Sequence, residues 1–582
     1  MKLSTAKYFS SSPYKHILLF VAFLIFSNIL FAKGEKKLKI NQLQSEILFN
    51  KKSGCAPATV QRELNINNVR ARILNGGDLW WDLSSAKYEI PKVASGQISK
   101  SSLFAGAIWV GGVTNGNLRL AAQKYRQNSN DYYPGPLDIN TASITTSECL
   151  KYDKIWGTYL TDIDNFRKNP SNWLNPINDI GTWPAMGDVS LGEAKYLAPF
   201  FDNNGDGIYD PAVGDYPSFD QNSSKNIPDQ MMWWVYNDKG NIHSESFGMP
   251  IGLEFQEQAF AYSTNDEINN MTFYRTKIIN RSSEKFDSCI IGQWVDPDLG
   301  FKNDDYIEFD VQRNLGICYN GYDFDSTING YGLNPPSIGI NFLEGPKRSD
   351  GTTIGLTKFI YFNGGKGVNL YGNRDQPTNA NQYWNYLNGR WKKGSQLTYG
   401  GTGFGGTDTT SFAFPGTTDP MHSPEWTERT ANDTPGNRCF LMSSGPFSLL
   451  PGAINNVTIA VVWARVSSGG ATGSINLLKQ ASDKAYSFYK KSFSTGINEI
   501  NYSSNQNIIP FPNPGKDQIQ LFNLSEDADE IYFYNLSGQE CLIQKLKDSK
   551  IIETSFIQNG IYLYQIKNKQ GDVIKTGKWF KD

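Results

Sequence analysis

Short runs of bulky residues set between glycines constrain what this chain can fold into. The run 102–112 alternates small, bulky and β-branched residues and ends on two glycines, and similar runs lie at 77–82 and 118–123. Buried antiparallel strands between glycine turns have this pattern. The 582-residue chain also contains 54 Gly, 27 Pro and 13% aromatic residues, a composition that favours many short strands. We therefore predict a mainly β fold with a β-sandwich or jelly-roll-like passenger region.

One later segment has helical spacing instead. Leu478, Ala481, Ala485 and Phe488 recur at the spacing of one helix face. We therefore predict a single late helix over residues 474–489.

Trp80, Trp81 and Trp109 lie inside the strand-like runs. Buried aromatic side chains dominate the cores of proteins of this kind. We therefore expect these indoles to pack in the core, with a carbohydrate-stacking platform as the alternative.

The first residues predict a secretory signal peptide. Lysines precede an apolar stretch, 17–32, that ends on a small alanine. Its unbroken apolar part, 17–26, is shorter than the roughly 20 residues that a membrane-spanning helix needs. We expect residues 1–32 to direct export through the Sec translocon and then to be removed, with an uncleaved anchor as the alternative. Residues 33–60 are predicted to form a linker.

Charge and cysteine content exclude several function classes. Lys plus Arg total 55 against 57 for Asp plus Glu, a net charge of −2, so there is no field of one sign to hold nucleic acid. The six cysteines include no CxxC pair, which argues against zinc knuckles and thioredoxin-like redox motifs. Disulfides are allowed in an exported protein but optional for so large a core. Only His243 and His422 follow the predicted signal peptide, so few histidines are present to form a catalytic or multi-histidine metal site.

The last part of the chain has a different pattern, short alternating segments separated by polar turns. About 75 residues with six or seven such strands are typical of a small Ig-like sandwich. The strands are predicted at 518–522, 530–534, 540–544, 551–554, 561–566 and 573–579.

The same residues resemble the type A sorting domain of the type IX secretion system of Bacteroidota. The matching residues are Pro512, Asn513 and Pro514 at the start, Gly538 in the middle, Gly560 and Tyr562 near the end, and the terminal Lys575 and Lys578. The resemblance implies that the outer-membrane type IX machinery recognises residues 507–582 and that a cell-surface sortase removes them. It also implies frequent attachment of the cargo to lipopolysaccharide. We expect a secreted or outer-surface protein, with residues 494–506 as the linker to this domain.

One loop has the spacing of a calcium site. Asp202, Asn204, Asp206, Ile208 and Asp210 occupy its positions one, three, five, seven and nine, with a glycine at position six. Ca²⁺ takes six to eight oxygens, and this spacing folds several of them onto one centre. Position twelve is a valine rather than the expected Glu, so we expect Asp215 or a distant carboxylate to complete the shell. The alternative is a plain turn rich in Asp and Asn.

A second acidic cluster follows, between two strand-like runs at 272–280 and 288–294. Crowded carboxylates repel one another unless a cation or solvent separates them. We predict a second calcium site between these strands, with solvated turns as the alternative. Its ligands would be Asp296, Asp298, Asp304 and Asp305.

Residues 61–493 form the passenger region, in which we expect two or more subdomains. This region is similar to a recurrent type of large exported Bacteroidota protein, a resemblance that carries over no activity. We expect a non-catalytic passenger, stabilised by calcium, that acts in binding, adhesion or surface structure, with lipopolysaccharide or glycans as partners. The alternative is a secreted glycan-acting hydrolase that uses Asp and Glu carboxylates, which need separate environments on opposite sides of a bond.

Overall fold

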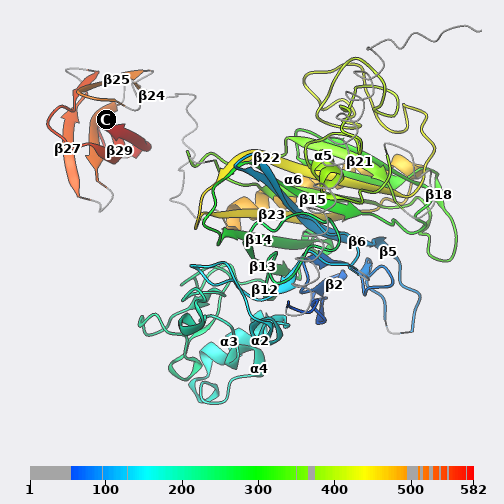
Figure 1. Cartoon of the computed structure of the whole chain (residues 1–582), viewed down its shortest axis with the longest axis horizontal. Helices are drawn as coiled ribbons and strands as arrows, with labels where there is room; N and C mark the ends of the chain where they lie inside the picture. The colour runs from blue at the N-terminus through cyan, green and yellow to red at the C-terminus, as the bar shows by residue number, and fades with distance from the viewer. Residues whose placement is uncertain are drawn as a thin grey trace, which may run out of the picture. The chain divides into compact units, whose positions relative to one another are not determined.

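The computed structural model describes residues 54–94, 96–126, 129–348, 350–364, 374–493, 509–511, 515–522, 528–535, 539–546, 550–571 and 573–581. The predicted signal peptide and the linker before the sorting domain lie outside these residues. The chain divides into two compact units between Phe493 and Ser494 (Figure 1). Antiparallel strands dominate both units, so the prediction of a mainly β chain is confirmed.

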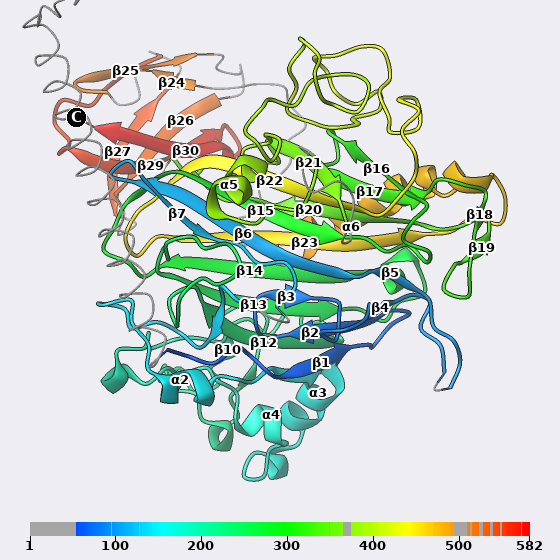
Figure 2. The same cartoon turned by 45° about the vertical axis from the view of Figure 1, so that its right-hand side comes forward.

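The first unit is built on two large antiparallel sheets, which Figure 2 shows lying one over the other. The first sheet has the order β21 (Lys358–Asn363), β22 (Arg438–Leu449), β15 (Phe286–Asp296), β6 (Ala105–Thr114), β3 (Asp78–Leu79), β2 (Arg70–Leu74), β4 (Tyr88–Glu89), β5 (Ser101–Leu103), with β1 (Gln61–Leu64) beside β2 and β7 (Asn117–Ala121) beside β6. The second has the order β16 (Asp305–Asp310), β17 (Leu315–Asn320), β20 (Ser337–Glu344), β23 (Ile454–Ala464), β14 (Thr272–Asn280), β13 (Leu253–Ala261), β12 (Gln230–Asn237), β8 (Tyr133–Pro134), with β9 (Trp156–Tyr159) beside β12. Two short hairpins pair β10 (Phe200–Phe201) with β11 (Tyr216–Pro217) and β18 (Phe324–Asp325) with β19 (Gly332–Leu333).

The second sheet is buried on both faces. Along β12, Trp234 and Tyr236 pack in the core between the sheets, while Trp233 and Val235 pack in a separate core on the other face. Successive side chains of a strand point to opposite faces. A strand between two cores therefore favours apolar side chains on both faces, as in the run Met231–Tyr236.

The tryptophans singled out in the sequence are core residues. Trp80, Trp81 and Trp109 are each 0% exposed, which confirms core packing and leaves no stacking platform at these positions. Trp80 donates its indole N–H to the Tyr274 hydroxyl of the facing sheet at 2.9 Å. The buried indole therefore has the polar partner that it needs.

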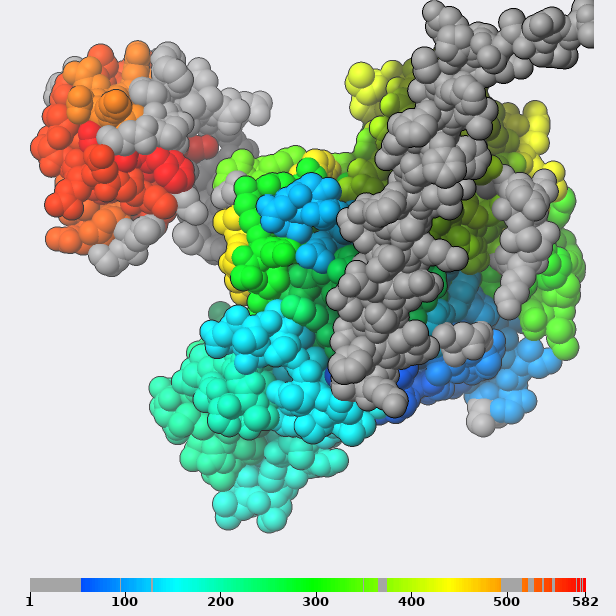
Figure 3. All heavy atoms as spheres, viewed as in Figure 1, coloured from blue at the N-terminus to red at the C-terminus, as the bar shows by residue number. Residues whose placement is uncertain are grey.

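The predicted late helix is present as α6 (Ile475–Phe493), and it covers the outer face of the second sheet over β20 and β23. The described residues also contain four shorter helices that the sequence analysis did not predict: α2 (Thr146–Lys151), α3 (Leu160–Lys168), α4 (Asn178–Gly181) and α5 (Ala380–Leu387). Helices of four to nine residues contain too few turns for a periodic pattern to stand out. The first three lie in a lobe that protrudes from the sandwich, drawn in cyan in Figure 3.

The second unit is a small β-sandwich. One sheet has the order β24 (Ile509–Phe511), β25 (Gln518–Phe522), β28 (Ile551–Glu553), and the other β27 (Glu540–Lys545), β26 (Ala528–Tyr534), β29 (Gly560–Asn568), β30 (Val573–Lys581). Trp579, Ile531 and Phe533 are fully buried in its core. All six predicted strands of this domain are present, with ends that differ by at most two residues.

Candidate functional site

The first predicted calcium loop lies in the protruding lobe, between β10 and β11. Asp202 accepts the backbone N–H of Gly205 at 2.7 Å and that of Gly207 at 2.8 Å. Asp206 accepts the N–H of Ile208 at 2.8 Å. These bonds wrap the backbone around the carboxylates, as a loop that collects oxygens around one centre requires.

Asp215 follows this loop in sequence and holds its backbone by two hydrogen bonds. Its side chain is fully buried and accepts the backbone N–H groups of Asn203 at 2.8 Å and Asp210 at 2.9 Å. Burial, together with the negative charges of Asp202 and Asp206, raises the pKa of the Asp215 carboxyl above its usual value. The structure therefore brings Asp215 to the loop, where the sequence analysis expected it.

Two other predicted ligands of the loop have further roles. The Asp210 carboxylate caps the short 3-10 helix Pro211–Val213 by accepting the Ala212 N–H at 2.8 Å. Asn204 donates its side-chain N–H to Asp206 at 2.8 Å. Among the residues that the structure describes, no group of three or more His, Cys, Asp and Glu side chains is arranged to hold a metal ion. Calcium at this loop stays a prediction.

The second acidic cluster lies in the strand-loop-strand setting predicted for it. β15 ends at Asp296 and β16 begins at Asp305. Both oxygens of Asp296 are occupied, one by the Tyr125 hydroxyl and the other by the Cys439 thiol at 3.3 Å. Burial raises the pKa of the Asp296 carboxyl to about 6.

The other carboxylates of the cluster lie at the end of the β16–β17 hairpin. Asp304 and Asp305 are buried, and Asn320 stands directly opposite Asp305 in the strand pairing. Asp325, at the end of β18, holds the same loop by accepting the N–H of Phe301 at 3.1 Å. The sequence analysis missed Asn320 and Asp325, which follow the cluster by more than ten residues.

A polar surface pocket of about 530 Å³, also missed in the sequence, lies on the first sheet beside β21. Lys358 donates from Nζ to the Ser411 hydroxyl at 2.8 Å. Burial and the neighbouring Arg390 charge lower the pKa of Lys358. Within the described part of the chain, neither of these cations has an ion-pair partner. The pocket lining is Lys358, Asn388, Gly389, Arg390, Gln396, Leu397, Asp408, Thr409, Thr410, Ser411, Phe412, Asp419, Met421 and His422.

The lining of this pocket also includes two acidic side chains and a histidine. His422 contacts Asp419 from Nδ1 at 2.7 Å and Asp408 from Nε2 at 3.5 Å. Its ring stacks on Tyr399 with 4.5 Å between the ring centres. The pocket lining therefore combines two cations with two carboxylates and an oriented imidazole.

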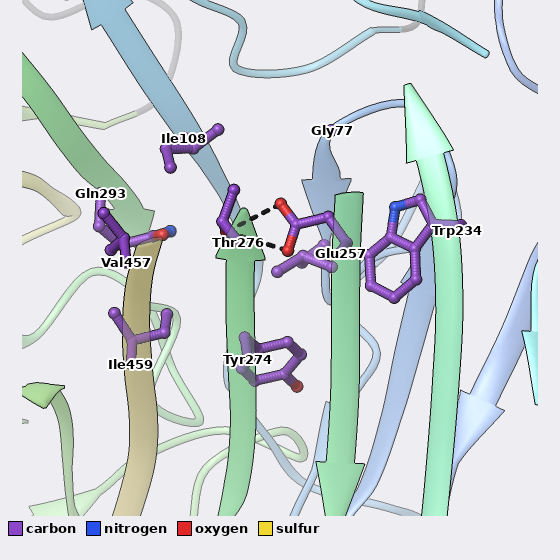
Figure 4. Close-up of a pocket in the computed structure, with 10 residues that line it drawn as sticks. Gly77, Ile108, Trp234, Glu257, Tyr274, Thr276, Gln293, Val457 and Ile459 are labelled. Atoms are coloured by element: carbon purple, nitrogen blue, oxygen red, sulfur yellow. Dashed lines mark hydrogen bonds between the residues drawn. The ribbon is translucent and has the colours of Figure 1, made fainter. Parts of the chain in front are cut away.

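A water-sized cavity of about 10 Å³ lies between the two large sheets (Figure 4). Glu257 on β13 is buried against it and accepts the Thr276 hydroxyl at 2.9 Å and the Tyr236 hydroxyl at 2.8 Å. Burial raises the pKa of Glu257 to about 7. Trp234 on the neighbouring strand points its indole at the same cavity. Because the cavity is internal and holds little more than one water, it is no ligand site.

The cysteines divide into one disulfide, three buried free thiols and the half-buried free thiol of Cys541. Cys55 forms a disulfide with Cys149 of α2, 94 residues apart. Cys289, Cys318 and Cys439 are buried free thiols. The disulfide ties the last residues of the predicted N-terminal linker to the passenger.

The predicted sorting residues fall partly within the described part of the second unit. Gly560 begins β29, Tyr562 is buried in the core of the domain, and Lys575 and Lys578 lie on β30. The other four, Pro512, Asn513, Pro514 and Gly538, lie outside the described residues. In the described part of the whole chain, no helix is long and apolar enough to cross a bilayer.

Comparison with known proteins identifies the second unit. Residues 510–577 match the family model of the secretion system C-terminal sorting domain. A search of curated proteins gives no match. Among solved structures, a polysaccharide lyase is similar over 56% of this chain and 34% of its own length, with 7% identity and a TM-score of 0.17. The chain thus spans about a third of the lyase's length, and a similarity this low carries no argument about function.

Proposed function

We propose that this type IX secretion cargo, exported to the outside or to the outer surface of the cell, is a non-catalytic binding protein whose β-sandwich passenger is stabilised by calcium. The observation that supports binding is the polar pocket beside β21. Two cations, Lys358 and Arg390, face it without an acidic partner among the described residues. Lys358 is half-buried and Arg390 is exposed. An unpaired cation in a half-buried setting favours an anionic group of a ligand.

The rest of the pocket suits a polyhydroxylated ligand. Hydroxyl and amide groups of Thr409, Ser411 and Asn388 line it, together with the acceptors Asp408 and Asp419. Sugar hydroxyls both donate and accept, so they match such a mixed surface. The proposed ligand is therefore a glycan that carries carboxylate or sulfate groups, which includes the lipopolysaccharide expected from the sorting domain.

The test is a titration of the purified chain with an oligosaccharide of uronic acids and with a neutral oligosaccharide of equal length. The acidic one is expected to bind more tightly, and Lys358→Met to weaken it about tenfold or more, because a charge-assisted hydrogen bond contributes about 1.5–3 kcal/mol. Lys225→Met removes an equal charge at an exposed position outside the pocket lining and serves as the control. If Lys358→Met and the parent chain bind the acidic oligosaccharide with equal affinity, this pocket is not the binding site.

The second candidate is a secreted glycan hydrolase, and the His422 contacts with Asp408 and Asp419 favour it within the same pocket. Carboxylates beside an oriented imidazole could transfer protons. The same oligosaccharides, followed for new reducing ends, separate the two functions. Turnover that Asp419→Asn abolishes would replace the binding proposal.

Calcium at the loop 202–215 is the stabilising part of the proposal. Three carboxylates, Asp202, Asp206 and Asp215, act on one another there, and the backbone is already wrapped around them. A chelator is expected to lower the melting temperature of the full chain, and Asp206→Ala to remove the part of that decrease that comes from this loop. A melting curve that chelation leaves unchanged would refute a calcium ion at this loop.

The early steps of export are also part of the proposal. Residues 1–32 would engage the Sec translocon, and the sortase would remove the sorting domain after transport. Mass spectrometry of the protein recovered from the native cell surface tests both cleavages, because an intact N-terminus or C-terminus would contradict one of them.

A further inference from the structure

The end of the β16–β17 hairpin holds several buried oxygens that have no donor. Oδ1 of Asp298, Oδ1 of Asp304, Oδ1 of Asp305 and Oδ1 of Asn320 are each shielded from solvent and lack a hydrogen-bond partner. A buried acceptor without a donor costs about 1–3 kcal/mol, and more when it is charged. Such atoms in one small region call for a partner that the protein side chains do not supply.

The strand register places two of these residues, Asp305 and Asn320, side by side. Asp305 and Asn320 are direct partners across the antiparallel β16–β17 pair, so their side chains leave the sheet on the same face. Gly321 donates its N–H to the Asp304 carbonyl, which fixes Asp304 beside the same hairpin end. Asn320 is 0% exposed, and its amide donates to the Tyr322 carbonyl at 2.8 Å, while its Oδ1 atom has no donor.

No cation of the protein neutralises the two central carboxylates. Within the described residues, no ion pair includes Asp304 or Asp305. Leu299 donates its N–H to the other oxygen of Asp305 at 3.1 Å. The nearby Asp325 is already satisfied by the N–H groups of Phe301 and Tyr331 and adds a further negative charge.

We propose that Asp304, Asp305 and Asn320 bind a calcium ion that joins the β16–β17 hairpin to the loop after β15. Oxygen-only ligands of mixed carboxylate and amide type are those that a hard divalent cation prefers. An amide oxygen supplies part of the set, so the site does not depend on three carboxylates converging on one point. Asp296, whose two oxygens are occupied, is left out of the ligand set.

A route from solvent reaches this site. Asp298 lines a surface pocket together with Gly300, Phe301 and Lys302, while its Oδ1 atom is shielded from solvent. An ion could therefore enter past Asp298 without unfolding of the hairpin. This site is separate from the loop 202–215 and from the pocket that contains Lys358, so it can fail without affecting either.

The experiment compares Asp305→Asn with the parent chain in calcium and in chelator, with the full chain in each case. In calcium, Asp305→Asn is expected to lower the melting temperature, because a ligand is lost. In chelator it is expected to raise the melting temperature, because a buried unpaired charge is removed. Calorimetric titration with Ca²⁺ is expected to lose one site in this variant.

Two further variants keep the result interpretable. Asp296→Asn changes a buried carboxylate of the same cluster outside the ligand set, so it is expected to retain the calcium stoichiometry of the parent chain. Asp206→Ala removes a predicted calcium ligand of the loop 202–215 and leaves the site at the hairpin end unchanged. Unchanged calcium stoichiometry in Asp305→Asn, or a higher melting temperature of this variant in calcium and chelator alike, would overturn the proposed site.

Discussion

Glu257 gives the sharpest quantitative prediction from the passenger core. Its carboxyl group lies between the two large sheets, where burial raises its pKa from 4.5 to about 7. The hydroxyls of Tyr236 and Thr276 donate to it and partly offset the burial. The substitution Glu257→Gln keeps the shape of the side chain and removes the titration.

The sign of the effect on stability follows from the pKa of Glu257 in the unfolded and in the folded chain. In the unfolded chain Glu257 loses its proton near pH 4.5, whereas in the folded chain it keeps the proton until about pH 7. Its contribution to stability is therefore complete below pH 4.5 and is lost as the pH rises through 7. A shift of roughly 2.5 pH units at about 1.4 kcal/mol each amounts to about 3 kcal/mol of lost stability.

The assay is urea unfolding of both proteins at a series of pH values from 4 to 8. The free energy of unfolding of Glu257→Gln minus that of the parent chain is expected to rise by about 3 kcal/mol across this range, whatever the fixed cost of the amide. Glu308→Gln is a matched comparison, because the pKa of that half-buried carboxyl is also raised to about 7 and its effect should have the same sign. A difference for Glu257→Gln that stays constant with pH would refute the burial argument.

One reduction and two substitutions test the packing of the passenger. Reduction of the Cys55–Cys149 disulfide, which closes a loop of 94 residues, is expected to cost about 4 kcal/mol, measured as a drop in melting temperature with reductant. Trp80→Ala is expected to cost about 3–5 kcal/mol in denaturant unfolding, because a fully buried indole leaves a cavity. Arg126→Met is expected to cost about 3–5 kcal/mol, because Asp78, paired with it at 2.6 Å and fully buried, would keep an uncompensated charge. A loss under about 1 kcal/mol in any of the three would contradict the burial seen here.

Much of the fold could be predicted from the sequence where the signal was local. The strand β14 has the predicted bounds Thr272–Asn280, and the late helix α6 covers the predicted segment. Period-two alternation and helical spacing are properties of neighbouring residues, so they can be recognised in the sequence without knowledge of the tertiary structure. The order of strands was out of reach, because β15 pairs with β6 and β22 from remote parts of the chain.

The two candidate calcium sites differ in the same way: one follows from local sequence spacing and the other depends on strand pairing. The ligands of the loop 202–215 follow one another in sequence, so their spacing alone predicts the site. At the hairpin end, Asn320 reaches Asp305 only through the register of β16 with β17, and the sequence analysis instead grouped Asp296 with its neighbours in sequence. Side chains at alternate positions leave a strand on opposite faces, so nearness in sequence is a poor guide to which carboxylates can share an ion. Buried oxygens without a hydrogen-bond donor are the better guide to an ion site, because each of them carries a free-energy cost that a bound partner would offset.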